Sequence, residues 1–218
     1  PDDVLARPES AHLPIASWFA DASRPLHVEI GSGKGTFLLG AARRQPGVNF
    51  LGIEYAGEFF AYAADRLRRA GVPNVRMLSV DAGEFVHWRV GPRSVQTIHL
   101  YFPDPWPKAK HHRRRMISDR FLGDAARVLA SGGELRVVTD HADYWAWMEE
   151  HFARWCRPAG GAPFVREAFV PDLPERDANA AGTPDDGVGD ELVGTNFERK
   201  YRLEGRTFHA AILRLAQP

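Results

Sequence analysis

The residues with the clearest chemical potential lie in one stretch, 102–115, with the sequence FPDPWPKAKHHRRR. Its first half places Asp104 between two prolines, directly after the apolar run 95–102, which is typical of a buried parallel strand. Each proline fixes its own φ and disfavours the helical region for the residue before it, so we expect Phe102, Asp104 and Trp106 to be extended. Because open α/β sheets bind ligands where their strands end, the pattern predicts a carboxylate on a stiff loop at a binding site.

The second half of the stretch is strongly basic and contains no acid. A field of this sign suits phosphate groups, although a solvated surface also carries charge runs. A carboxylate beside a phosphate-binding arm favours chemistry on a nucleic-acid base, whereas the structural alternative is a plain Pro-Asp-Pro loop next to a solvated face. The basic residues are Lys108, Lys110, His111, His112, Arg113, Arg114 and Arg115.

Length and composition indicate one ordinary globular domain. The chain has 218 residues, of which 44% are hydrophobic and 26% charged. It has no apolar run long enough to cross a bilayer, and residues 1–10 lack the apolar segment of a signal peptide. The single cysteine, Cys156, excludes an intramolecular disulfide and fits a reducing compartment. We therefore expect a cytoplasmic protein with no membrane partner, with no metal, and either monomeric or weakly homodimeric.

The formal net charge of zero is an average of two opposite regions. Residues 171–192 hold seven acids and one arginine, a net charge of −6, so the remainder of the chain carries +6. The same segment is rich in Pro, Gly, Ala and Asp, which predicts a mobile surface loop at about 171–194. The basic remainder is compatible with a nucleic-acid partner.

Lysine is rare in this chain, and its positions are clustered. Of the 28 lysines and arginines only four are lysines, and they fall within the short stretches 29–35, 102–115 and 195–200. An ammonium group and a guanidinium group are not interchangeable. Because the chain otherwise uses arginine for its basic residues, the few lysines are candidates for a specific role. They are Lys34, Lys108, Lys110 and Lys200.

The order of apolar runs and turn residues predicts a lead-in segment at 1–25, with one short helix near 15–20, followed by alternating strands and helices. Such alternation is typical of a mostly parallel sheet with right-handed crossovers and helices on both faces, here in a single α/β domain at 26–218. Ser131, Gly132 and Gly133 are expected to end a helix. The predicted strands are 26–30, 49–54, 74–80, 94–102, 134–139, 164–170 and 206–215, and the predicted helices are 36–44, 57–70, 83–89, 117–129 and 144–156.

A glycine-rich turn, EIGSGKG at 29–35, follows the first predicted strand. Glycines at such a turn allow a ligand to approach the backbone closely. A phosphate-binding P-loop is excluded, because Gly35 stands where Ser or Thr is required and Val28 stands where the first glycine is required. The dinucleotide fingerprint is met only in part, since Thr36 replaces its third glycine.

The remaining pattern, an acid followed by glycines at alternate positions, resembles the first motif of class I S-adenosylmethionine-dependent methyltransferases. Two further acids end the next two predicted strands. Three carboxylates at successive strand ends would line one edge of the sheet, and they suit a cationic sulfonium ligand better than an anionic dinucleotide. The resemblance implies cofactor contacts from Glu29, Gly31, Gly33, Glu54 and Asp81.

With the Pro-Asp-Pro stretch included, the chain resembles the bacterial tRNA (guanine-N7)-methyltransferases from about residue 26 to residue 215. The sequence FPDPW with its basic run is the specific element, because many unrelated methyltransferases share the glycine-rich motif. The resemblance implies a Rossmann-like class I methyltransferase fold with a seven-stranded sheet, S-adenosyl-L-methionine as cofactor, and tRNA as partner. It also implies methyl transfer to N7 of the variable-loop guanine at position 46. Two departures are Pro107, where many members have a polar residue, and a short segment before the first strand.

The same resemblance implies roles for individual residues. Asp104 matches the active-site residue, which is also a cofactor contact, and Lys110 to Arg115 match the run that contacts tRNA. Without the resemblance, Thr195 would be interpreted as the start of a strand or turn. Two rival interpretations stay open, a non-catalytic RNA-binding module with a methyltransferase-like sheet and a nicotinamide-dependent oxidoreductase. The positions that match substrate contacts are Lys108, Asp140, Thr195, Asn196, Phe197 and Glu198.

Overall fold

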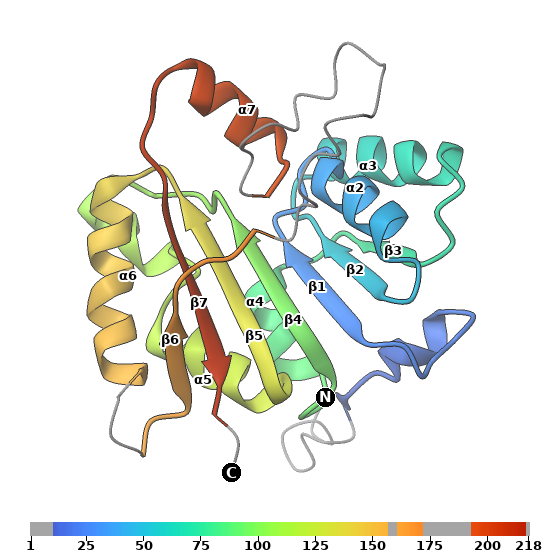
Figure 1. Ribbon diagram of the computed structural model, residues 1–218, viewed down its shortest axis with the longest axis horizontal. Helices are drawn as coiled ribbons and strands as arrows, with labels where there is room; N and C mark the ends of the chain where they lie inside the picture. Colours follow the sequence, from blue (N-terminus) through green and yellow to red (C-terminus); the bar gives the residue numbers. More distant parts are fainter. Residues whose placement is uncertain (1–10, 157–160, 172–192, 217–218) are drawn as a thin grey trace.

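The computed structural model describes residues 11–156, 161–171 and 193–216, which form one sheet with helices on both faces (Figure 1). The sheet has seven strands in the order β3-β2-β1-β4-β5-β7-β6. All pairs from β3 to β5 are parallel, and β7 is antiparallel to both of its neighbours. The predicted fold class, a mostly parallel seven-stranded sheet, is confirmed. The strands are β1 (Leu26–Ile30), β2 (Asn49–Ile53), β3 (Val75–Leu78), β4 (Val95–Tyr101), β5 (Leu129–Thr139), β6 (Phe164–Glu167) and β7 (His209–Leu215).

Nearly continuous apolar runs form the centre of the sheet. Every residue of β2 is buried, as are all but one residue of β1 and all but one of β4. This is the pattern of parallel strands that are covered on both faces. The register places Ile30 opposite Ile53 and Leu100, so β1, β2 and β4 end at the same level. Side chains that follow these strands therefore meet at one edge of the sheet.

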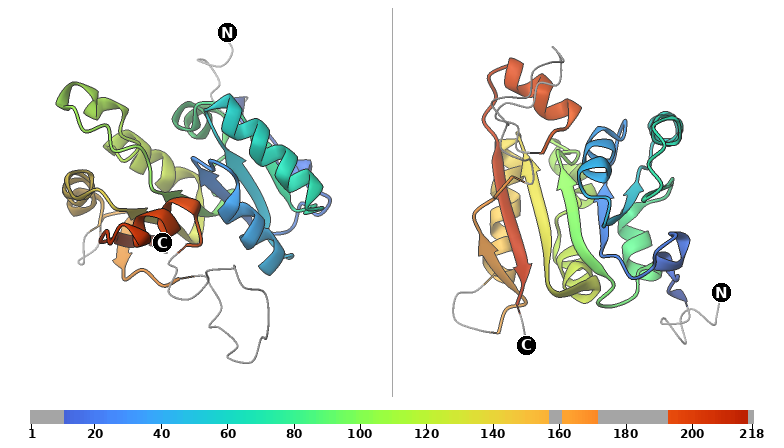
Figure 2. Two further views of the ribbon diagram at one scale, coloured as in Figure 1. Left: turned by 90° about the horizontal axis from the view of Figure 1, so that it is seen from above. Right: turned by 45° about the vertical axis from the view of Figure 1, so that its right-hand side comes forward.

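The helices divide into two layers. Apolar residues of α2 and α3 pack on one face of the sheet in a cluster that includes Phe37, Phe50 and Leu67. Apolar residues of α4, α5 and α6 pack on the other face in a cluster that includes Phe121 and Phe152. Both layers are visible in Figure 2 (right). The helices are α2 (Thr36–Arg44), α3 (Gly57–Arg69), α4 (Ala82–Arg89), α5 (Asp119–Val128), α6 (Ala142–Trp155) and α7 (Asn196–Leu203), with 3-10 helices η2 (Ile15–Trp18) and η3 (Ala109–Arg114).

One predicted boundary is wrong. The segment Ser131, Gly132 and Gly133 does not end a helix but lies inside β5, and α5 already ends at Val128. The β4–β5 pairing shifts its register in this region, and Gly132 has a φ of 70°. A Cβ atom on Gly133 would lie 2.8 Å from the carbonyl oxygen of Gln96. The glycines therefore allow an irregular strand to approach its neighbour closely.

Four shorter elements also differ from expectation. The lead-in helix is a single 3-10 turn, and the last predicted strand begins at His209 rather than at 206. The residues before it form α7, which was not predicted, and the basic run forms η3. Residues 1–10 and nearly all of the acidic segment predicted as a mobile loop at about 171–194 lie outside the described residues. Within the described part of the chain, no helix is long and apolar enough to cross a membrane.

Candidate active site

A cleft of about 560 Å³ opens where β1, β2 and β4 end. A second groove, of about 680 Å³, continues from it between α4 and α5 and shares Asp81, Asp104 and Trp106 with it. Open α/β sheets bind ligands at this edge. Ten of the predicted site residues line the cleft together, and they are Glu29, Gly31, Gly33, Glu54, Asp81, Asp104, Arg114, Thr195, Asn196 and Phe197.

The glycine-rich turn after β1 forms part of the cleft wall. Gly31, Gly33 and Gly35 have φ values of 75°, 51° and 68°, a region that other residues rarely occupy. Nothing lies within 4 Å of a Cβ atom built on Gly31 or Gly33, so the backbone here faces open space. At Gly35 the same atom would lie 3.1 Å from Ala63 on α3. The turn is therefore open to a ligand on one side and packed against α3 on the other.

Glu29 is a buried acid with an unused oxygen. Glu29 is only 3% exposed, and its Oε2 atom has no hydrogen-bond partner among the described residues. Burial raises the pKa of Glu29 to about 8, a hydrogen bond from Ser32 opposes this, and the nearby charge of Glu54 adds to it. A carboxylate in this position is stabilised by a cation in the cleft, because the cation offsets the desolvation. The site therefore fits a positively charged ligand.

Glu54 is held in place by backbone hydrogen bonds. Gly33 N donates to Oε2 at 2.7 Å, and Ala56 N donates to Oε1 at 2.8 Å. Each oxygen keeps a second lone pair for a donor in the cleft. This carboxylate therefore joins the end of β2 to the glycine-rich turn and fixes their relative positions.

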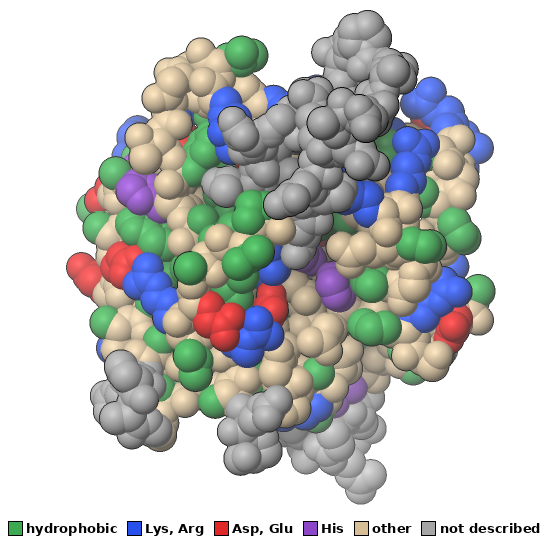
Figure 3. All heavy atoms as spheres, viewed as in Figure 1, with side chains coloured by type: hydrophobic (Ala, Val, Ile, Leu, Met, Phe, Trp, Pro, Cys, Tyr) green, Lys and Arg blue, Asp and Glu red, His purple; other side chains and the backbone are tan. Residues whose placement is uncertain are grey.

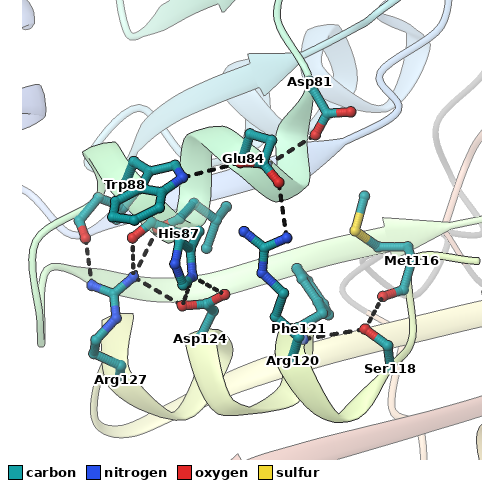
Figure 4. A network of polar contacts seen from close by, with 12 residues as sticks. Asp81, Glu84, His87, Trp88, Met116, Ser118, Arg120, Phe121, Asp124 and Arg127 are labelled. Carbon is teal, nitrogen blue, oxygen red and sulfur yellow. Dashed lines mark hydrogen bonds and ion pairs between the residues drawn. The ribbon is translucent and has the colours of Figure 1, made fainter. Parts of the chain in front are cut away.

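Asp81 follows β3 and caps α4. Its Oδ1 accepts a hydrogen bond of 2.9 Å from Glu84 N, and its other oxygen faces away from the helix (Figure 4). Glu84 is in turn bonded by Trp88 Nε1 at 3.0 Å and by Arg120 Nη1 at 2.8 Å. On the next turn of α4, His87 bonds Asp124 of α5. These contacts brace α4 against α5 and thereby position the cap residue at the cleft.

The loop that carries Asp104 is kinked rather than extended. Phe102 and Trp106 have φ values of 52° and 43°, so the expectation that they are extended is wrong. Tertiary packing overrides the preference before proline, since the Phe102 ring contacts Tyr201 and Phe208, with centroids 5.8 and 5.5 Å away. No hydrogen bond or ion pair joins the exposed carboxylate of Asp104 to another described residue. It is therefore available to a ligand.

Arg115 holds the loop that carries Asp104 in place. Its Nε donates a hydrogen bond of 2.9 Å to the carbonyl oxygen of Pro105, and its Nη2 bonds the carboxylate of Asp143. The guanidinium lies over the rings of Tyr144 and Trp147, 5.0 and 5.4 Å from their centroids. Because the side chain is only 1% exposed, Arg115 lies apart from the solvent-exposed face where we expected it to meet tRNA.

The rest of the basic run forms an exposed border of the cleft. Lys108 precedes η3, and Lys110 and Arg113 lie on it, all exposed. The guanidinium of Arg114 lies 4.8 Å from the centre of the Trp106 ring, beside the cleft. The two histidines are half-buried, with ring contacts between His111 and Trp106 and between His112 and Trp147.

The motif at 195–198 begins α7. The Thr195 hydroxyl accepts a hydrogen bond from Glu198 N at 3.0 Å, and the Glu198 carboxylate accepts bonds from Val193 N and Gly194 N at 2.9 Å each. This is a form of the capping box. Glu198 is fully buried and also pairs with Arg202, so it anchors the helix while Asn196 and Phe197 face the cleft.

Of the predicted basic run only Arg114 lines the cleft, and three of the predicted substrate contacts do not line it. They are Glu198, Lys108 and Asp140, whose carboxylate pairs with Arg206 at 2.6 Å. Conversely, the cleft lining includes residues that were absent from the predicted site, and four of these have exposed lysine or aromatic side chains. Their sequence signals differ, because the rarity of lysine marked two of them, whereas no pattern marked the two aromatic residues. The four are Lys34, Tyr55, Phe59 and Lys200.

The strand order and the position of the cleft define a class I methyltransferase fold. The structure is similar to a SAM-dependent O-methyltransferase from Thermotoga maritima, with a TM-score of 0.53, 16% identity, and coverage of 94% of this chain and 64% of that one. It is similar also to an rRNA methylase from Streptococcus thermophilus, with a TM-score of 0.52, 12% identity, and coverage of 94% and 93%. At these identities the likeness concerns the fold alone.

Sequence comparison identifies the family. A family model described as "Putative methyltransferase" matches residues 23–157. The tRNA (guanine-N(7)-)-methyltransferase of Halorhodospira halophila is 33% identical over 214 residues, which cover 95% of this chain and 82% of that protein. The enzyme of the same name from Streptococcus suis is 33% identical over 155 residues, 71% of this chain and 72% of that protein. The chain belongs to the tRNA (guanine-N(7)-)-methyltransferase family.

Proposed function

We propose that the chain transfers a methyl group from S-adenosyl-L-methionine to N7 of the variable-loop guanine at position 46 of tRNA. The observation that carries this proposal is the position of Asp104. Its carboxylate, which has no hydrogen bond or ion pair with another described residue, lies in the same cleft as three acids at strand ends, and an exposed basic border adjoins it. The names of the relatives support tRNA as the substrate.

Three acids suit the cofactor in different ways. Glu29, whose buried Oε2 has no partner in the described part of the chain, would hold the cationic amino acid end, and the open backbone at Gly31 and Gly33 leaves space for it. Glu54 has lone pairs for the two ribose hydroxyls, and Asp81 would lie beside the adenine. The row as a whole stabilises a cationic ligand.

The reaction places few demands on proton transfer. S-Adenosylmethionine supplies, when bound, an electrophilic methyl group on a sulfonium. Guanine N7 has an in-plane lone pair and no proton, so its attack needs no general base, and alignment is the main requirement. As the methyl group moves, positive charge develops on the purine, and Asp104 stabilises it there while accepting hydrogen bonds from the guanine edge.

The remaining residues bind and orient the tRNA. Lys108 would contact a phosphate or a base oxygen, and Asp140 and the first turn of α7 with Thr195, Asn196 and Phe197 would close over the nucleotide. Glu198 contributes by anchoring that turn. The exposed border of Lys110, Arg113 and Arg114, with His111 and His112 beside it, would contact the tRNA backbone.

The test is methylation of a defined tRNA. The chain is incubated with labelled S-adenosylmethionine and an unmodified tRNA transcript, and the nucleosides are then separated. We expect 7-methylguanosine, and we expect none when guanine 46 of the transcript is replaced by adenine. Label in another nucleoside, or label that persists after the replacement, would refute the proposed position. Failure to bind the cofactor in calorimetry would instead favour a non-catalytic RNA-binding module.

A further inference from the structure

The cleft has a second basic border in addition to η3. Lys34, in the glycine-rich turn, and Lys200, on α7, both line the cleft and are exposed. Val193 and Phe208, which flank α7, pack in the same apolar cluster as α2. The basic run instead leads into α5, which packs on the opposite face of the sheet. Viewed from above, η3 lies on one side of the strand ends, and α2 and α7 lie on the other (Figure 2, left).

The position of Lys34 is set by its backbone. Arg66 Nη1 donates hydrogen bonds to the carbonyl oxygen of Lys34 at 3.2 Å and to the hydroxyl of Thr36 at 2.8 Å, which ties the turn to α3. The Nζ atom of Lys34 lies 5.8 Å from the centre of the exposed Tyr62 ring. No acid forms an ion pair with Lys34 within the described ranges. Its ammonium group is therefore available at the mouth of the cleft.

Lys200 is only weakly paired. Its Nζ lies 3.9 Å from Oε1 of Glu204, and the side chains of both residues are well exposed. Ion pairs of this kind contribute little, because water and salt screen them. The other oxygen of Glu204 lies 2.7 Å from Arg206, so Lys200 shares this carboxylate with a closer cation. Lys200 therefore keeps the ability to pair with an anion.

Exposed aromatic rings accompany the two lysines. Phe59 on α3 and Phe197 on α7 are 43% and 46% exposed, and both line the cleft. Phenylalanine rings exposed at a cleft are suited to stacking on unpaired nucleic-acid bases. Figure 3 shows Lys and Arg side chains in the region of α2, α3 and α7. Cations and flat apolar rings together are the chemistry of a single-stranded RNA contact.

We propose that Lys34, Phe59, Phe197 and Lys200, here called the far rim, bind the tRNA strand on the side of the target guanosine remote from η3. The proposal rests on the proposed function and extends it. The RNA strand extends in both directions from a nucleotide that is bound in the cleft, so phosphate groups lie on two sides of the cleft. The basic residues of η3 would bind the phosphates on one of these sides. Two lysines on separate elements match an extended polyanion, whereas the single carboxylate of a cofactor would need only one.

Charge-neutral substitutions test the far rim. Affinity for an unmodified tRNA transcript is measured at several salt concentrations for the 218-residue chain, for Lys34→Gln, for Lys200→Gln and for the double variant. The control is Arg43→Gln, which removes one exposed charge from the last turn of α2, at the end remote from the cleft. Affinity for S-adenosylmethionine is measured on the same samples by calorimetry.

We expect the slope of log affinity against log salt to become shallower by about 0.7 to 0.9 for each lysine removed. We expect the control to keep the parent slope and all variants to keep their cofactor affinity. An unchanged slope in the double variant would overturn the far rim. A loss of cofactor affinity with an unchanged slope would assign the lysines to the cofactor and overturn it as well. Because binding is measured apart from chemistry, absence of 7-methylguanosine with the parent chain would refute the proposed function separately.

Discussion

Arg115 Nε donates a hydrogen bond to the carbonyl oxygen of Pro105, 10 residues earlier in the chain and next to Asp104. The last residue of the basic run thus holds the loop that carries the candidate active-site carboxylate. Asp143 and the rings of Tyr144 and Trp147 hold the guanidinium in turn, so α6 sets the position of the loop. We infer from these contacts and from its burial that Arg115 positions the loop of Asp104 rather than contacting phosphate.

Arg115→Ala should therefore slow methyl transfer and leave the salt dependence of tRNA binding unchanged. A displacement of the loop by about 1 Å is enough to lower the single-turnover rate by roughly 100-fold. Arg115→Lys should recover only part of this rate, because an ammonium group cannot bond Pro105 and Asp143 in the same fork geometry. Circular dichroism checks that the variants fold. The matched control is Arg113→Ala, which should show the reverse pattern, a shallower salt slope with the rate at saturating tRNA retained.

Glu29 should release a proton when the cofactor binds. Its pKa of about 8 keeps the free carboxyl group largely protonated at pH 7, and a bound cation favours the ionised form. Affinity for S-adenosylmethionine should therefore rise as pH increases from about 6 to about 8 and level off above that value. Calorimetry in buffers with different ionisation enthalpies measures the proton. If Glu29→Gln releases as much proton as the parent chain, the assignment is wrong.

Two histidines, the half-buried His27 and the buried His99, should make the fold sensitive to acid. Burial and the charge of Arg136 lower the pKa of His27 to about 4, and burial lowers the pKa of His99 well below 6.5. In the unfolded chain both histidines have a pKa near the ordinary value of about 6.5, so they bind protons there before they do so in the folded chain. The free energy of unfolding should therefore fall as pH decreases from about 6.5 towards 4. The slope reaches about 1.4 kcal/mol per pH unit for each histidine.

Urea unfolding at pH 7 and pH 5 measures this loss. His27→Gln should lose less stability between the two pH values than the parent chain does, because one of the two protonation sites is gone. His12→Gln, at a half-buried histidine before β1, serves as the control and should behave like the parent chain. Equal losses in the parent chain and in His27→Gln would contradict a lowered pKa of His27 in the folded chain.

The sequence was sufficient to predict which acids lie at the ends of the strands. It was not sufficient to predict which side chains of the basic run point into the protein. Apolar runs followed by an acid located Glu29, Glu54 and Asp81 at one sheet edge, because parallel strands end at the same side. A run of arginines does not reveal which guanidinium turns inward. The burial of Arg115 depends on Asp143, 28 residues away on α6, and only the folded chain brings them together.

Local rules failed where tertiary contacts opposed them. The preference before proline predicts extended backbone at Phe102, yet packing against Tyr201 and Phe208 holds a positive φ. The first turn of α7 carried a recognisable signal, since Thr195 and Glu198 have the spacing of a capping box. That signal stands next to a long acidic segment of turn-forming residues, and the composition of that segment favoured a loop or strand over a helix.

The central claim is that Asp104 stabilises charge on the guanine while methyl transfer occurs. The most direct measurement is the single-turnover formation of 7-methylguanosine by Asp104→Asn, at saturating S-adenosylmethionine and tRNA, with the fold checked by its thermal unfolding. We expect a rate at least about 100-fold below that of the parent chain, as for the loss of one preorganised electrostatic group. An Asp104→Asn variant that forms 7-methylguanosine at the parent rate would contradict it.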